Sequence, residues 1–227
     1  MNGVILIVLL AAVLALAFAA FNYKTVKALE EGSPLMSEIA GAIRVGASAF
    51  IRYEYWVLYT VVAVVAVILA LVTSWQSAAA FLIGSVMSGC AGFIGMKIAT
   101  YANVRVSNEA QRTRSIGKTV KVAFRGGSVM GLSVGGFALL GIFIVYGIFG
   151  MAMGQLTETA SVTNWIGVSF LPFPMTLSGY ALGCSIVAMF NRVGGGIYTK
   201  AADMGADLVG KTEANIPEDD PRNPATI

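Results

Sequence analysis

Five long apolar stretches dominate the hydrophobic pattern of this 227-residue chain. Each is close to the roughly 20 residues that an α-helix needs to cross the hydrocarbon core of a bilayer. Pro172 and Pro174 fall inside the last stretch and indicate where that helix starts, since proline is tolerated in a first turn. The pattern predicts an all-α fold, a polytopic transmembrane helix bundle with spans at about residues 4–21, 56–72, 78–96, 126–153 and 165–191.

The helical pattern continues past the apolar stretches on one side of the predicted membrane. Segments 22–55 and 97–125 have helical patterns that we expect to extend the neighbouring spans into the cytosol. The fifth helix has no clear stop at the membrane surface and is expected to run to about Lys211, although three consecutive glycines weaken it locally. Residues 212–227 are acidic and proline-rich and predict a cytosolic loop.

The basic residues are sorted by side. If the N-terminus lies outside, all 15 Lys and Arg fall in or beside cytoplasmic segments, and outer segments 73–77 and 154–164 contain none. Because positive charge favours the cytoplasmic side, we expect an integral membrane protein with its N-terminus outside. The first span is expected to be retained rather than cleaved as a signal peptide, because no positive charge precedes it.

Composition narrows the function. Only 12% of the residues are charged, against about 25% in soluble domains, which argues against a soluble enzyme and a disordered chain. A net charge of +3 is too small for a nucleic-acid binder, and the absence of His excludes His-ligated metals. The two cysteines lie in apolar stretches without metal-binding spacing and are interpreted as packing residues. Small residues repeat every four positions, which favours close helix packing, at Gly84, Ser88 and Gly92 and at Gly127, Gly131 and Gly135.

The acidic residues gather after the fifth span. At about 100° per residue, a helix places two lysines and two aspartates on one stripe about 16 Å long: Lys200, Asp203, Asp207 and Lys211. Carboxylates one turn apart suit Mg²⁺, and lysines on the same stripe suit phosphate, so the pattern favours a metal-bridged phosphate. The turn at Glu218 and Asp219 would add metal ligands if it folds back over the helix.

The same spacing has a simpler interpretation. Lys200 with Asp203, and Asp207 with Lys211, are also ordinary helical ion pairs. Arg192, at the edge of the stripe, is either a residue that extends its charge to the membrane interface or a gate charge in an ion path. Spacing alone leaves both interpretations open.

The run from Arg192 to Lys211, RVGGGIYTKAADMGADLVGK, resembles the signature of membrane-integral inorganic pyrophosphatases, the proton- or sodium-pumping kind. The continuation from Thr212 to Ile227 is similar to the same family's next stretch. The resemblance implies a pump that hydrolyses pyrophosphate at a cytosolic site and moves H⁺ or Na⁺ out of the cytosol. The expected cofactor is Mg²⁺, with K⁺ or Na⁺ as a further activator, and the expected assembly is a homodimer in membrane lipid.

The resemblance also implies roles for individual residues. Lys200 and Lys211 would bind pyrophosphate, and Arg192 would act as the ion transport gate. Four acids would hold Mg²⁺ or belong to the charged site around it: Asp203, Asp207, Glu218 and Asp219. A family member has roughly sixteen spans, or about 320 residues of membrane helix. We therefore expect an N-terminal portion that is inactive alone, with the water-activating acids beyond Ile227.

Two other functions remain open from the sequence. The chain could belong to a non-enzymatic ion channel or secondary transporter, in which the charged stripe lines a vestibule and no hydrolysis accompanies flux. It could also be a structural or assembly module without catalysis. We expect weak or no binding of a Mg²⁺–pyrophosphate analogue to the isolated chain, and neither the pumped ion nor K⁺ dependence can be derived from these residues.

Overall fold

The computed structural model describes residues 2–217 and 220. Helices dominate this part of the chain, with one two-stranded hairpin before the last helix. The chain divides into two compact units, Met1–Ala188 and Met189–Ile227. The elements are α1 (Asn2–Lys27), α2 (Pro34–Val72), α3 (Trp75–Thr113), α4 (Ile116–Val145), the π-helical segment η1 (Tyr146–Ala152), β1 (Val162–Thr163), β2 (Ser169–Phe170) and α5 (Pro172–Thr212).

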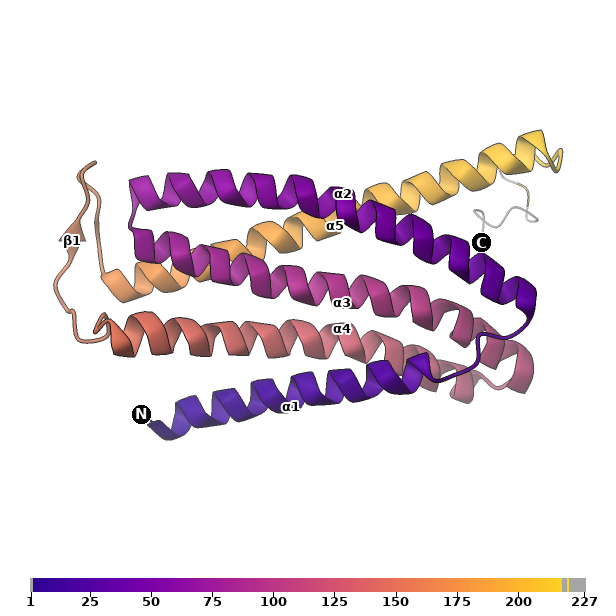
Figure 1. The fold of residues 1–227 in the computed structure, drawn as a ribbon, viewed down its shortest axis with the longest axis horizontal. Coiled ribbons are helices and arrows are strands. Elements are labelled where there is room, and N and C mark those ends of the chain that lie inside the picture. Colours follow the sequence, from indigo (N-terminus) through magenta and orange to yellow (C-terminus); the bar gives the residue numbers. More distant parts are fainter. Residues whose placement is uncertain (1, 218–219, 221–227) are drawn as a thin grey trace. The chain divides into compact units, whose positions relative to one another are not determined.

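The first unit is built on four long helices. α3 packs between α2 and α4, and α1 packs along α4, each pair of neighbours antiparallel (Figure 1). Connections 28–33 and 114–115 lie at one end of this unit, and the N-terminus, residues 73–74 and residues 153–171 lie at the other (Figure 1). In the described part of the chain, five helices are long and apolar enough to cross a membrane, so this is an integral membrane protein.

Short polar connections explain why neighbouring helices reverse direction. Ser33 caps α2 by accepting the N–H of Met36 at 3.3 Å, with Pro34 in the first turn. Ser74 caps α3 in the same way, accepting the N–H of Ser77 at 3.2 Å. A serine N-cap satisfies a backbone donor that the helix itself leaves without a partner. The chain can therefore start a new helix directly after a turn.

The first half of α5 packs closely on α3 within the first unit. Gly183 approaches the α3 backbone so closely that a Cβ added there would collide with the carbonyl oxygen of Phe81. One turn away, a Cβ at Gly84 would collide with the Tyr180 carbonyl oxygen. The Ser88 hydroxyl donates to the Cys184 carbonyl at 3.2 Å. Small residues thus let the two backbones meet, as expected for membrane helices.

The other small-residue repeat does not pack in this unit. Positions 127, 131 and 135 of α4 face open space, and a Cβ added at any of the three glycines would meet no heavy atom of the described residues within 4 Å. The adjacent face of α4 makes the contacts instead, where Gly136 meets Leu16 of α1. Spacing identified both repeats, but only one of them is a contact surface within the described part of the chain.

The start of α5 differs from the predicted span. The helix begins at Pro172, as the two prolines predict, whereas the apolar stretch taken as the fifth span already starts at Trp165. Asn164 organises a hairpin before it, because its side-chain oxygen accepts the N–H groups of Ile166 and Val168 at 3.2 and 2.8 Å. The Trp165 indole N–H donates to the Leu71 carbonyl at the end of α2. The polar groups of residues 164–168 therefore form hydrogen bonds without a helix.

Candidate functional site

The charged stripe predicted from the sequence lies on one uninterrupted helix in the second unit. α5 carries Arg192, Lys200, Asp203, Asp207 and Lys211 without a break at the three glycines. Both lysines are exposed, and both aspartates are partly exposed. The helix therefore presents two cations and two carboxylates within about three turns.

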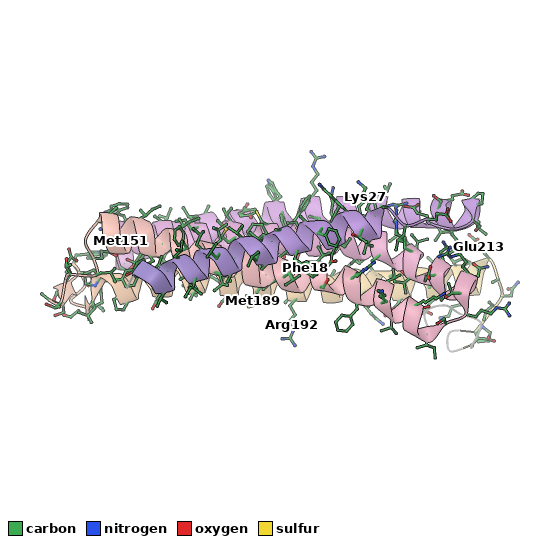
Figure 2. All side chains as sticks on the ribbon, turned by 90° about the horizontal axis from the view of Figure 1, so that it is seen from below. Phe18, Lys27, Met151, Met189, Arg192 and Glu213 are labelled. Carbon is green, nitrogen blue, oxygen red and sulfur yellow. The ribbon has the colours of Figure 1, made fainter. Side chains whose placement is uncertain are left out.

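Arg192 stands about two turns before the stripe on the same helix. Its side chain extends outward from α5 (Figure 2). Along the helix axis it lies about 12 Å from Lys200. Arg192 therefore lies outside the stretch of α5 that carries the stripe.

The helix ends just after Lys211. The Ile216 N–H donates to the Gly210 carbonyl at 2.9 Å, and Asn215 adopts a left-handed conformation with φ of 50°. Asparagine tolerates this region better than most residues, so it suits a helix C-terminus. The chain leaves the helix axis at this point. The predicted metal ligands Glu218 and Asp219 lie outside the described residues.

The acids of α5 form a partial donor set for Mg²⁺. Among residues 2–217 and 220, no group of three or more Asp, Glu, Cys or His side chains could hold a metal ion. Asp203 and Asp207 supply two carboxylates one turn apart. Mg²⁺ is commonly held by one or two carboxylates, with waters and phosphate oxygens completing its shell. The residues present therefore fit a Mg²⁺ shared with a phosphate ligand, and do not form a closed all-protein site.

A charged cluster in the first unit is absent from the sequence-based predictions. Glu31, in the connection between α1 and α2, accepts hydrogen bonds from Arg44 at 2.5 and 2.9 Å and from the Ser37 hydroxyl at 2.8 Å. Arg105 of α3 lies 3.2 Å from the same carboxylate. The hydrogen bonds from Arg44 are the main reason that the pKa of Glu31 falls from 4.5 to about 2.

Arg105 ties this connection to α3. Its guanidinium is 6% exposed and donates to the carbonyls of Leu29 at 2.8 Å and Lys27 at 2.9 Å. It also lies over the Tyr101 ring, as do Lys27 and Arg44. Such a network orders the chain between two helices. It is a structural cluster, and neither its charges nor its position indicate a substrate.

Glu54 is the second feature missed by the sequence analysis. Its side chain is 8% exposed, and neither carboxylate oxygen has a hydrogen-bond partner among the described residues. It occupies the buried register of α2, between Ile51 and Leu58. A carboxyl in a register otherwise filled by apolar residues is the sequence signal that could have identified it. Acids buried among membrane helices usually have a partner or a functional role.

Comparison with known proteins decides the family. A family model described as inorganic H⁺ pyrophosphatase matches residues 13–227. The chain belongs to the inorganic H⁺ pyrophosphatase family. The chain is 60% identical, over 94% of its length, to a K⁺-stimulated pyrophosphate-energized sodium pump of Thermotoga maritima.

The relatives of this chain differ in the ion that their names give. It is 46% identical over its whole length to a putative K⁺-stimulated pyrophosphate-energized sodium pump of Clostridium tetani. It is 44% identical, over 95% of its length, to a K⁺-insensitive pyrophosphate-energized proton pump of Moorella thermoacetica. In each case the match covers 29–30% of the relative. The chain therefore spans about a third of the length of the curated relatives that it matches.

Proposed function

We propose that this chain is part of a pyrophosphate-energised cation pump, in which hydrolysis of pyrophosphate to two phosphates drives H⁺ or Na⁺ out of the cytosol. The observation that carries the proposal is the 60% identity to a pyrophosphate-energized sodium pump over almost the whole chain. The stripe on α5 supports it independently, because it combines the two residue types that a metal-bridged phosphate requires.

The lysines and the aspartates of the stripe have different roles in binding pyrophosphate. The amino group of Lys200 contacts a phosphate oxygen, and Lys211 supplies a second cation at the far end of the stripe. Asp203 and Asp207 hold Mg²⁺, and when bound the metal neutralises phosphoryl charge. Glu218 and Asp219 complete the acidic side of the site. Phosphoryl transfer depends mainly on positioning and charge stabilisation, which is what these side chains provide.

The order of the charged residues along α5 relates the pyrophosphate site to ion transport. Arg192 lies nearer the apolar part of α5 than the stripe does, so we assign it to the ion path below the pyrophosphate site. The stripe then faces the cytosol, on the side where the basic residues gather. The complete pump is expected to work as a homodimer, with K⁺ or Na⁺ as an activator in addition to Mg²⁺.

The test uses the full-length pump that contains this chain. In purified protein reconstituted into vesicles, Lys200→Ala and Asp203→Asn are expected to lower Mg²⁺-dependent pyrophosphate hydrolysis at least about 100-fold, because each removes a charge that stabilises the transferring phosphoryl group. Glu213→Gln is the matched control, since Glu213 follows α5 directly and falls on the opposite side of the helix from Lys200. It is expected to retain activity.

Ion flux distinguishes the alternatives. Pyrophosphate-dependent uptake of ²²Na⁺ or acidification of the vesicle interior should fall together with hydrolysis in both stripe variants. Retained hydrolysis in Lys200→Ala or Asp203→Asn would contradict the site. Ion flux without any hydrolysis in the unmodified protein would instead indicate a channel or secondary transporter.

A further inference from the structure

An apolar cavity of about 380 Å³ opens between α1, α3 and α4 in the first unit. Its lining is mostly apolar and includes Leu16 and Ala20 of α1 and Phe137 of α4. Ligand-binding clefts in proteins start at about 300 Å³, so the cavity is large enough to take part of a ligand. Its walls are helices that are long and apolar enough to cross a membrane.

Two lysines stand at one end of this cavity. Lys24 of α1 and Lys97 of α3 both line it. Lys24 lies in the last turn of α1, and Lys97 lies just past the middle of α3, in the half that leads to connection 114–115. The Lys97 amino group lies 5.0 Å from the centre of the Phe93 ring, which also lines the cavity. The amino groups are thus positioned where an apolar tail would give way to a headgroup.

The neighbouring helices supply no negative charge to these lysines. Among the described residues, neither Lys24 nor Lys97 takes part in an ion pair. α1 and α4 contain no Asp or Glu. The one acid of α3, Glu109, lies about 18 Å from Lys97 along the helix axis and pairs with Arg112. Within the described part of the chain, the cavity therefore combines an apolar interior with two cations that lack a counter-ion.

We propose that this cavity binds one anionic phospholipid of the membrane, with an acyl chain between α1, α3 and α4 and its phosphate group on Lys24 and Lys97. A basic pocket between membrane helices on the cytoplasmic side is suited to an anionic headgroup. A further helix is about 10–12 Å wide with its side chains, which is too wide for the helix itself to enter a space of about 380 Å³. A single acyl chain is narrow enough to enter.

The binding test uses the intact pump that contains this chain, purified in detergent and equilibrated with phosphatidylglycerol or with phosphatidylcholine of the same acyl chains. Native mass spectrometry should show one tightly retained phosphatidylglycerol per chain and weaker retention of phosphatidylcholine. The double variant Lys24→Gln/Lys97→Gln should weaken phosphatidylglycerol binding by about 30-fold, because each lysine contributes to holding the anionic headgroup.

Two further variants separate this site from general attraction to the membrane. Lys118→Gln/Lys121→Gln removes the same charge from exposed positions that do not line the cavity, and it should leave retention unchanged. Ala20→Phe fills the cavity and should reduce retention while both lysines remain. An equal loss in the two lysine double variants would overturn the proposal, as would equal retention of the two lipids by the unmodified protein. The proposal does not depend on pyrophosphate hydrolysis, and its failure would leave the proposed function untouched.

Discussion

At the scale of single residues, Glu31 shows how one carboxylate organises a helix connection. It is contacted by two arginines from different helices, Arg44 of α2 and Arg105 of α3. Hydrogen bonds to a charged acceptor contribute more than neutral ones. The connection between α1 and α2 is therefore held in place largely by charge.

The depressed pKa of Glu31 predicts a pH dependence. Because the pKa is lower in the folded protein (about 2) than the ordinary value of 4.5, the ionised carboxylate stabilises the fold above pH 4.5, and this contribution is lost as the pH falls toward 2. Glu31→Gln should lower stability at pH 7 by about 1–2 kcal/mol, a modest value because the carboxylate remains partly solvated. In thermal unfolding in detergent, the difference in unfolding temperature between Glu31→Gln and the unmodified protein should become smaller between pH 4.5 and pH 2.

Glu109 offers the control for this prediction. It pairs with Arg112 at 2.9 Å near the end of α3. Arg112 is 65% exposed, and a helical pair three residues apart contributes little, so Glu109→Gln should change the unfolding temperature only slightly at any pH. If the unfolding temperatures of Glu31→Gln and the unmodified protein differed by the same amount from pH 7 to pH 2, the lost stability would come from packing and not from the charge.

At the scale of elements, the contact between α3 and α5 depends on the absence of side chains. Gly183 and Gly84 bring the two backbones together, and Ser88 adds a hydrogen bond across the same contact. This contact holds the first half of α5 against the bundle. The charged second half of α5 is a continuation of this same helix.

Substitution of one glycine in this contact and of one glycine in the α4 repeat tests whether the two surfaces differ. Gly183→Ala would place a methyl group against the Phe81 carbonyl, and backbone atoms cannot move aside as a flexible side chain can. It should cost about 1–3 kcal/mol and several degrees of thermal stability. Gly131→Ala meets open space and replaces glycine inside a helix, so stability should stay the same or rise slightly. Fluorescence-detected size-exclusion chromatography after heating measures both, and equal losses would contradict the assignment of the contact.

At the scale of the whole molecule, charge asymmetry is the feature that gives the first unit a direction. The Lys and Arg of residues 2–188 fall in the half of the unit that leads to connections 28–33 and 114–115, since residues 2–14, 53–72, 75–94 and 131–145 contain none. The opposite end carries the β1–β2 hairpin and no basic residue. The positive-inside rule then predicts that the hairpin lies outside and the basic end lies in the cytosol.

Cysteine labelling checks this orientation. In a background with Cys90→Ser and Cys184→Ser, Ser161→Cys should react with a membrane-impermeant maleimide in intact cells, because the loop before β1 is expected outside. Gly117→Cys, at the start of α4, should react only after the membrane is permeabilised. The reverse pattern would mean that the basic end faces outward, which would contradict the predicted orientation.

The parts of the fold that depend on local sequence could be predicted. Membrane helices are set by runs of apolar residues, their starts by caps and prolines, and the alignment of Lys200 with Asp203 and Asp207 by the period of the helix alone. Trp165 shows the limit of this approach. It is apolar and falls in the predicted fifth span, but hydrogen bonds from Asn164 and Trp165 place it in the hairpin before α5.

The sequence by itself determined how many helices the chain makes, which side their charges are expected on and which charges share a face of α5. Only the tertiary structure decided which glycine repeat is a contact, that Glu31 meets Arg105, that Glu54 is buried, and that Lys24 and Lys97 border one cavity. The physical reason is the distance along the chain over which each interaction acts. Hydropathy, helix period and capping act within a few residues, whereas contacts between helices depend on rotation and depth, which no single segment specifies.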